Sequence, residues 1–450
     1  MQLHGLLPLL EPILEPARAA VDAGERLVLG VPDGAKPAVV AALARDRPVL
    51  VIAGKTDRAE RFAEELAAWT GAESRVFLYP ESDAIPYERT ADTEAAQERL
   101  AVLQALHRHN ETMPIVVAPI QALAQPTIAP AQLNRSAETV RAGSRLKMDA
   151  LLRRLESLGY AFEPLVEGTG QAARRGGIVD VFPPDATLPV RIEFLGDSVD
   201  SLRRYHPATQ RTTELIAEVV LGPAREAQAD PDRIAALRAS MSFEHVELGL
   251  RPRLEEELDQ LERGTWRGAG LFAPFLLDAT LLDHLSPNTL IVTDEQHDLA
   301  LHLDDLDKQA EEARAQLEMA GQIPAGLPLP HRSRAELFAA LQLRSPVVDL
   351  QRWAVEEEPE PTLTPGPSPA RRERGASAGT GSTVSPLSRP AGEGPGVRAD
   401  PTIVLPFTPV QGFGGRRRSV FAVVNGAVRA GHRAVIVSLQ SARLAVLFEG

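Results

Sequence analysis

The sequence contains no cysteine, which excludes disulfides, thiolate metal sites and cysteine nucleophiles. Aromatic residues make up only 4% of the 450 residues, so platforms that stack on nucleic-acid bases are not expected. Positive charge is also scarce, because 48 Lys and Arg against 61 Asp and Glu give a net charge of −13. This acidity argues against a chain that coats DNA by bulk charge, since neutralising phosphates needs clustered basic residues.

Long apolar runs are lacking as well. No run reaches the roughly 18 residues that a membrane-spanning helix needs. The first 14 residues are apolar, but they lack a cationic start and are interrupted by Pro8 and Pro12, so they predict a docking helix and not a signal peptide. A hydrophobic share of 44% is ordinary for globular proteins. We expect a cytoplasmic chain of about three domains with no membrane contact.

Residues 1–124 alternate predicted strands with predicted helices. Apolar runs at 27–29, 49–53, 76–79 and 115–118 are typical of buried strands. Between Thr56 and Trp69 the apolar positions recur at helical spacing, which predicts a helix that lies on a core. Strands separated by helices predict an α/β fold, with a parallel sheet covered by helices.

The pattern of predicted strands and helices changes after residue 124. Residues 125–212 contain a helix near 146–158 and two short alternating strands at 178–182 and 190–194, which predict a small inserted α+β domain. Residues 213–350 return to a helix-rich pattern with a buried strand at 290–293, and we expect them to complete the first domain. In 361–400, Pro, Gly and Ser account for 19 of 40 residues, so a disordered linker is expected over 351–400.

Residues 401–450 are predicted to begin a further small α/β domain, with a helix at 420–430 and a strand at 434–437. Ser441 then follows as a possible helix cap shortly before Gly450. This unfinished strand–helix unit predicts that the natural protein continues, although a terminus with a frayed helix is the alternative.

A degenerate phosphate-binding loop follows the first predicted strand. A working loop has the pattern G-x-x-x-x-G-K-[ST], whose second Gly lets backbone N–H groups surround phosphate and whose hydroxyl binds Mg²⁺. Here Gly30 and Lys36 are retained, but Ala35 replaces the second Gly and Pro37 replaces the hydroxyl residue. Pro37 therefore removes a metal ligand and a donor. An ordinary strand–turn–helix is the alternative interpretation.

Two further fragments resemble parts of a nucleotide-binding site. Gly54-Lys55-Thr56 is a literal G-K-T, but the five residues before it are predicted strand, so we interpret it as a strand-to-helix turn. Asp294 and Glu295 follow a buried strand, where such a pair holds Mg²⁺ in NTPases; a solvated strand end is the alternative. Together the fragments predict a nucleotide-binding core that has lost its nucleotide, with no catalytic residue and no metal site.

The pattern as a whole resembles the UvrB-homology region of the bacterial transcription-repair coupling factor family. The resemblance covers about 1–345 and 401–450, and the 361–400 tract departs from it. It is most specific over 159–160, 166–167 and 175–183, the last of which reads RGGIVDVFP. The segments that carry it are 77–80, 85–88, 98–100, 119–123, 159–160, 166–167, 175–183, 189–194, 197–203 and 210–212.

The resemblance implies what the residues alone do not show. It implies that 1–124 and 213–350 are the two halves of a helicase-like domain and that 125–212 is a UvrB-like second domain that binds UvrA. The family removes stalled RNA polymerase with an ATP-driven DNA translocase, so ATP, Mg²⁺, RNA polymerase and double-stranded DNA are expected to bind beyond residue 450. UvrB carries an aromatic hairpin here, whereas this chain has a short connection with Tyr87 as its one aromatic residue, so damage probing is not expected.

The predicted UvrA-binding patch lies in a basic part of the acidic chain. Residues 125–212 carry twelve basic and ten acidic residues, a net charge of +2 against −15 for the remainder, which suits an acidic protein partner. Arginine pairs bidentately with carboxylates and is enriched in binding hot spots. By resemblance, Arg175 matches the family arginine at the UvrA surface. The predicted contact residues are Tyr160, Phe162, Arg174, Arg175, Gly176 and Gly177.

Several alternatives remain open at this point. The arginine pair is also compatible with a plain solvated turn, and Asp180 either orders the arginine loop or is a satisfied core carboxylate. The basic cluster 416–418 either contacts DNA, begins a helix or is solvated. The main functional hypothesis is an interaction module that recruits UvrA without hydrolysing nucleotide. The alternatives are an active UvrB-type ATPase and a non-catalytic DNA-binding scaffold.

Overall fold

The computed structural model describes residues 3–71, 75–82, 87, 93–108, 113–227, 230–263, 271–352, 400–407 and 417–431. The chain forms two compact units, Met1–Leu405 and Pro406–Gly450. In the second unit the structure describes helix α12 (Arg417–Arg429) and a few flanking residues. Residues 353–399 of the linker expected at 351–400, the strand expected at 434–437, Ser441 and Arg416 lie outside the described residues.

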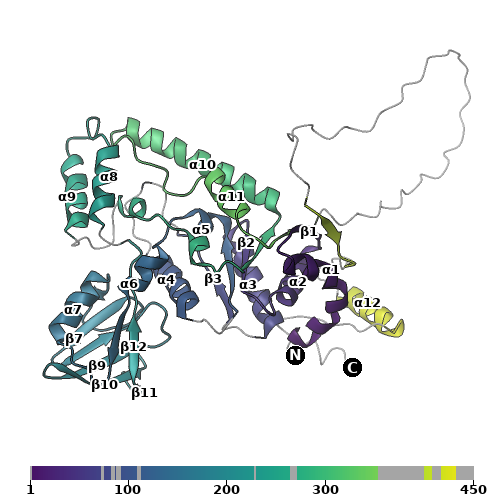
Figure 1. Ribbon diagram of the computed structural model, residues 1–450, viewed down its shortest axis with the longest axis horizontal. Helices are drawn as coiled ribbons and strands as arrows, with labels where there is room; N and C mark the ends of the chain where they lie inside the picture. The colour runs from purple at the N-terminus through teal and green to yellow at the C-terminus, as the bar shows by residue number, and fades with distance from the viewer. Residues whose placement is uncertain are drawn as a thin grey trace, which may run out of the picture. The chain divides into compact units, whose positions relative to one another are not determined.

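A seven-stranded parallel sheet organises the first unit (Figure 1). Its strand order is β15-β1-β14-β13-β2-β4-β3, and every neighbouring pair is parallel. The prediction of a parallel α/β fold is therefore confirmed. The strands are β1 (Arg26–Gly30), β2 (Val49–Ala53), β3 (Val76–Leu78), β4 (Ile115–Pro119), β13 (Leu290–Asp294), β14 (Val347–Gln351) and β15 (Thr402–Val404).

The segments that connect these strands form helices, because the apolar residues of these segments recur at helical spacing. In α3, for example, Ala59, Phe62 and Leu66 are buried on one side, as the sequence stripe predicts. The apolar N-terminus also packs inward, with Leu3, Leu7 and Leu14 buried. The elements are η1 (Leu3–Leu9), α1 (Glu11–Asp22), η2 (Asp33–Ala35), α2 (Lys36–Leu43), α3 (Thr56–Thr70), α4 (Thr93–Arg108), α5 (Ile120–Ala124), η5 (Leu281–His284), α10 (Gln296–Met319) and α11 (Arg334–Gln342).

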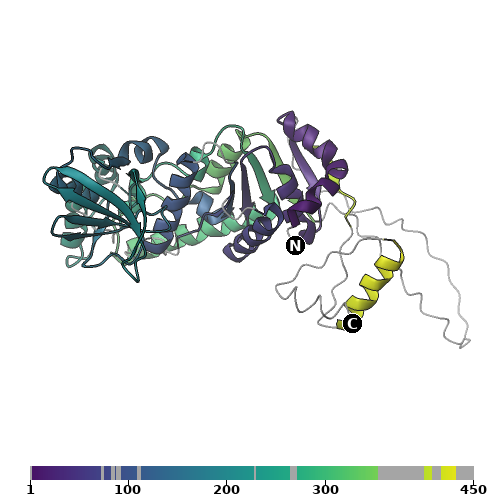
Figure 2. The same ribbon diagram turned by 90° about the horizontal axis from the view of Figure 1, so that it is seen from below.

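A small domain is inserted between β4 and β13. Its six-stranded sheet has the order β11-β10-β9-β8-β7-β6 and is antiparallel except for the pair β6–β7 (Figures 1 and 2). Helix α7 contributes Leu151 and Leu155 to a core with one face of this sheet. The elements are α6 (Pro130–Ser136), β5 (Glu138–Arg141), α7 (Met148–Ser157), β6 (Ala161–Phe162), β7 (Gln171–Arg175), β8 (Ile178–Val181), β9 (Val190–Leu195), β10 (Ser198–Tyr205), β11 (Thr212–Ile216) and β12 (Glu218–Leu221).

A helical region with its own core follows the small domain. Helices α8 (Pro231–Ser240) and α9 (Arg251–Glu262) pack with η4 (Ala273–Leu276) around Leu254, Leu258 and Phe272. Tyr87 belongs to this core, where its hydroxyl donates to the Pro328 carbonyl at 2.9 Å and its ring stacks on a phenylalanine. The aromatic residue that the sequence singled out in this connection is thus a packing residue.

Two segments lie differently from the sequence expectation. The sheet of the small domain extends past residue 212, because β11 pairs with β10, and β12 then pairs with β5. The residues of β11 are almost all exposed, so they show no alternating burial that the sequence could reveal. Strand β15 does not begin a separate domain, since it pairs with β1 at the edge of the large sheet and belongs to the first unit. Among the described residues, no helix has the length and apolarity to cross a membrane.

Candidate functional site

The first candidate site lies where β1, β13 and β14 end, at the carboxyl edge of the large sheet. Gly30 ends β1, and Lys36 begins α2 after a short 3₁₀ turn. Asp294 ends β13, and Glu295 precedes α10 with a left-handed backbone (φ 61°). The fold thus brings Lys36, Asp294 and Glu295 together from sequence positions about 260 residues apart, as the fragments of a nucleotide site predict.

Lys36 is fully buried and its ammonium group is surrounded by carboxylates. Its Nζ donates to Asp294 Oδ1 and to Glu295 Oε1, both at 2.6 Å, and lies 3.1 Å from Asp33 Oδ1. The ligand oxygens of the three acids lie within 4.8 Å of one another, as a divalent cation would require. The ammonium of Lys36 therefore stands at the position where these oxygens converge.

Two arginines complete this network. Arg58, from α3, donates through Nε to Asp294 Oδ2 at 2.7 Å and contacts Asp33 at 3.3 Å. The Arg352 backbone N–H donates to Glu295 Oε1 at 2.9 Å, and its guanidinium lies 3.7 Å from Asp33. Three cationic side chains face three carboxylates, so the network, which we call the Lys36 network, is charge-balanced.

The pKa directions agree with this balance. Burial alone would lower the pKa of Lys36, but Asp294 and Glu295 outweigh burial and raise that pKa above its ordinary value. The neighbouring Asp349 is buried, and burial raises its pKa despite hydrogen bonds from Gln351, the Gln296 N–H and Thr293. Lys36 is charged at neutral pH, and its donors are directed at protein carboxylates.

The literal G-K-T is a turn, as predicted. Gly54 and Lys55 connect β2 to α3, and Thr56 is the first residue of α3. Lys55 is exposed, and its backbone is extended at the helix cap. Because β2 occupies the five preceding residues, no loop forms there that could surround a phosphate.

The second candidate site lies on the small domain, at the hairpin that joins β7 to β8. Arg175 pairs with Ile178 at the end of the hairpin, so Gly176 and Gly177 form a two-residue turn. Gly176 has a φ of 60°, which side chains other than Gly rarely adopt. The two glycines therefore set the end of β7 and fix where the Arg175 side chain leaves the sheet.

Arg175 belongs to a network on the sheet face opposite α7. Its Nη2 donates to Asp180 Oδ2 at 2.7 Å and to Gln210 Oε1 at 3.2 Å. Arg191, from β9, donates to both oxygens of Asp180 at 2.8 and 2.9 Å and to Gln210 Oε1 at 2.8 Å. Asp180 is only 1% exposed, whereas Arg175 is 47% exposed. Asp180 is therefore a satisfied buried carboxylate that also orders the arginine, and both alternatives hold.

Arg174 does not share that face, which corrects the prediction of a single arginine pair. Successive residues of a strand point to opposite faces, so Arg174 lies on the face of α7 with Ala172. Its guanidinium is 3.6 Å from Asp149 of α7, and the side chain is 51% exposed. A contact surface that includes Arg175 therefore cannot use Arg174 on the same sheet face.

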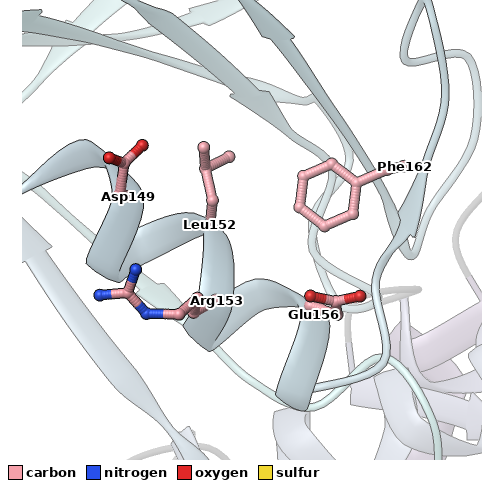
Figure 3. Close-up of a pocket in the computed structure, with 5 residues that line it drawn as sticks. All are labelled: Asp149, Leu152, Arg153, Glu156 and Phe162. Atoms are coloured by element: carbon pink, nitrogen blue, oxygen red, sulfur yellow. The ribbon is translucent and has the colours of Figure 1, made fainter. Parts of the chain in front are cut away.

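Phe162 also lies on the α7 side. It is 43% exposed and lines a pocket of about 390 Å³ together with α7 (Figure 3). Figure 3 shows its ring beside the α7 side chains, which come from one side of that helix. Phe162 is thus exposed, as a docking residue requires, but it belongs with Arg174 and not with Arg175. The residues that line the pocket are Asp149, Leu152, Arg153, Glu156 and Phe162.

Tyr160 is a core residue, which corrects its prediction as a contact residue. It is 4% exposed, and its hydroxyl donates to the Gly222 carbonyl at 3.0 Å. This bond joins the residue before β6 to the residue after β12. Tyr160 therefore supports the fold and does not reach a partner.

Five residues of the two networks were not among the predicted site residues, namely Asp33, Arg58, Arg191, Gln210 and Arg352. Arg191 lies between Val190 and Ile192, which are buried. This alternation could have predicted that Arg191 lies on the sheet face opposite the apolar core. Gln210 gives no such signal, because it lies in a turn and has a positive φ of 57°.

Comparison with known proteins gives a consistent result. Residues 139–226 match the family of UvrB interaction domains, a range that runs from β5 to just beyond β12. A transcription-repair-coupling factor of Myxococcus xanthus is 33% identical over 253 residues, which cover 54% of this chain and 21% of that protein. Over this region the chain is thus similar to transcription-repair-coupling factors. Two further relatives with that name agree, from Bacillus subtilis (28% identical; 60% of this chain and 24% of the relative) and Escherichia coli (29%; 60% and 24%).

These comparisons place the Arg175 network within the matched domain. Asp180, Arg191 and Gln210 all fall between residues 139 and 226, whereas the Lys36 network lies outside that range. The chain spans less than a quarter of the length of these curated relatives. The small domain is thus the part of the chain to which a family with a named interaction can be assigned.

Proposed function

We propose that this segment is a recruitment module of transcription-coupled nucleotide excision repair in the cytoplasm, and that it binds UvrA through its small domain. The observation that carries the proposal is the match of residues 139–226 to the UvrB interaction domain family. The Arg175 network supports it, because two guanidinium groups converge at a partly exposed face of this domain. Arginine in such a place is a preferred anchor of protein interfaces.

The segment is proposed not to hydrolyse ATP. Lys36 is engaged by Asp294 and Glu295, and Pro37 stands where a working loop has a Mg²⁺-binding hydroxyl. ATP hydrolysis, Mg²⁺ binding and contacts with RNA polymerase and double-stranded DNA, which the family resemblance implies, are proposed for other parts of a longer protein. Equilibrium dialysis with labelled ATP tests this, and micromolar binding that is lost in Lys36→Ala would support the UvrB-type ATPase instead.

The UvrA proposal is tested with the whole 450-residue chain and purified UvrA. Arg175→Ala should weaken the complex by about tenfold or more, which is the effect of losing a hot-spot arginine. Arg174→Ala is the matched control, because it removes the same charge from the next residue on the opposite sheet face. Binding is measured by biolayer interferometry.

Two results would count against the proposal. One is a wild-type chain that does not bind UvrA. The other is an equal loss in Arg174→Ala and Arg175→Ala, since a general charge effect would act on both residues alike.

A further inference from the structure

Two guanidinium groups converge on one neutral oxygen in the Arg175 network. Gln210 Oε1 accepts from Arg175 Nη2 at 3.2 Å and from Arg191 Nη2 at 2.8 Å. The same two nitrogens also donate to Asp180 Oδ2, at 2.7 and 2.9 Å. The amide oxygen therefore occupies a position between two cations, where a carboxylate oxygen would bind more strongly.

The charges in this network do not balance. Asp180 supplies one negative charge, Arg175 and Arg191 supply two positive charges, and Gln210 is neutral. The neighbouring Arg203 is already paired with Glu193. One positive charge is left in surplus, at a face where Arg175 is 47% exposed.

The surroundings hold both the amide and the second arginine in place. The Gln210 Nε2 donates to the Pro207 carbonyl at 2.8 Å, which turns the Oε1 toward the arginines. The Gln210 backbone N–H donates to His206 at 2.8 Å. The guanidinium of Arg191 lies 4.4 Å from the centre of the Tyr205 ring, an arrangement that favours a cation. The acceptor position is thus fixed before any partner arrives.

We propose that Gln210 Oε1 occupies, in the free protein, the position that a carboxylate of the partner takes in the complex. An Asp or Glu side chain of the partner takes the position of Gln210 Oε1 between Arg175 Nη2 and Arg191 Nη2. Asp180 is the positioning residue, because it holds the two arginines where both can donate to the partner's carboxylate. This inference rests on the proposed binding of UvrA and names the chemistry of the contact.

The substitution Gln210→Glu places a carboxylate of nearly the same shape in this position. The internal carboxylate should pair with both arginines, so the thermal unfolding midpoint should rise while the affinity for UvrA falls by about tenfold or more. A merely structural role of Gln210 predicts no such opposition, since damage to the fold would lower both quantities.

Arg211→Gln is the matched control, because Arg211 is the exposed next residue and its loss also makes the chain more negative by one charge. Its effect on UvrA affinity should be within about twofold. Affinities are measured by biolayer interferometry and midpoints by differential scanning fluorimetry, both on the full chain.

The outcomes separate the inference from the proposed function. Wild-type binding with an unchanged Gln210→Glu affinity overturns the carboxylate position and leaves UvrA recruitment standing. Equal losses in Gln210→Glu and Arg211→Gln also overturn it, because net charge would then explain both. A wild-type chain that does not bind UvrA removes the proposed function, and the partner named here with it.

Discussion

The Lys36 network and the Arg175 network are built from the same chemistry but differ in charge balance and exposure. In the Lys36 network, three cations face three carboxylates, and the central ammonium is fully buried. In the Arg175 network, two arginines face one buried carboxylate, and one of the arginines is half-exposed. A balanced and closed network has no charge left for a ligand, whereas an unbalanced and open one has.

The difference shows how two ionic networks in one chain can leave different amounts of charge available to a ligand. At the edge of the large sheet, the lysine that a phosphate loop retains has acidic partners within the protein. On the small domain, the guanidinium donors are aligned by Asp180 and are not fully neutralised. The predictions below test whether burial and balance are the properties that distinguish the two networks.

The largest effect is expected for Lys36→Met, which removes the central cation from the closed network. Asp294 is 5% exposed and would be left as a buried carboxylate with only Arg58 beside it. Breaking a buried ion pair from one side costs about 3–5 kcal/mol of the free energy of unfolding. Urea unfolding followed by circular dichroism measures this loss.

Lys55→Met is the control for that experiment. Lys55 is exposed in the G-K-T turn, so its removal should change the free energy of unfolding by no more than about 0.5 kcal/mol. Similar losses in the two variants would mean that Lys36 is not the centre of a buried network.

A smaller effect is expected for Asp180→Asn, which removes the carboxylate of the open network. Arg175 is 47% exposed and can turn toward water, so less is lost than when a buried ammonium is removed. We expect a loss of about 2 kcal/mol, the size of a hydrogen bond to a charged group. The same urea experiment measures it, and a loss as large as that of Lys36→Met would contradict the distinction between open and closed networks.

The smallest effect concerns two histidines of the large domain that are outside both networks. The His284 Nε2–H donates to the Ile128 carbonyl at 2.8 Å, so His284 Nδ1 accepts from His107 Nε2 at 3.0 Å. Burial is the main cause that lowers the pKa of His284 to about 4, and His107 lowers it further, against the opposing effects of Ile128 and Asp283. Both imidazoles are therefore neutral near pH 7.

The sign of the pH dependence follows from this lowered pKa. The unfolded chain takes up a proton at His284 as the pH falls below about 6.5, and the folded chain does not, so stability decreases with acidification. The contribution of His284 should be about 1 kcal/mol lower at pH 5.5 than at pH 7.5. His284→Gln should flatten this part of the pH profile, and an unchanged slope would show that the histidine is not the cause.

Much of the fold could be predicted from the sequence because it depends on local patterns. The apolar run at 49–53 and the helical stripe after Thr56 correspond to β2 and α3 within a residue or two. The loss of the second Gly and of the hydroxyl at Pro37 was likewise visible in one octapeptide. In contrast, β15 could not be assigned to the large sheet, because its place beside β1 depends on a strand far away in the sequence.

The sequence by itself determined the parallel α/β fold, the small inserted domain and the departures of the 30–37 loop from the phosphate-loop pattern, because spacing and residue type suffice for these. Only the tertiary structure decided that Arg174 and Phe162 lie on the α7 side, that Tyr160 is buried, and that Gln210 stands between two arginines. The reason is that local patterns specify which residues alternate, whereas the packing of α7 decides which face is covered. Charge balance is likewise a property of residues that meet in space, and for Lys36 and Asp294 that meeting spans 258 positions of the chain.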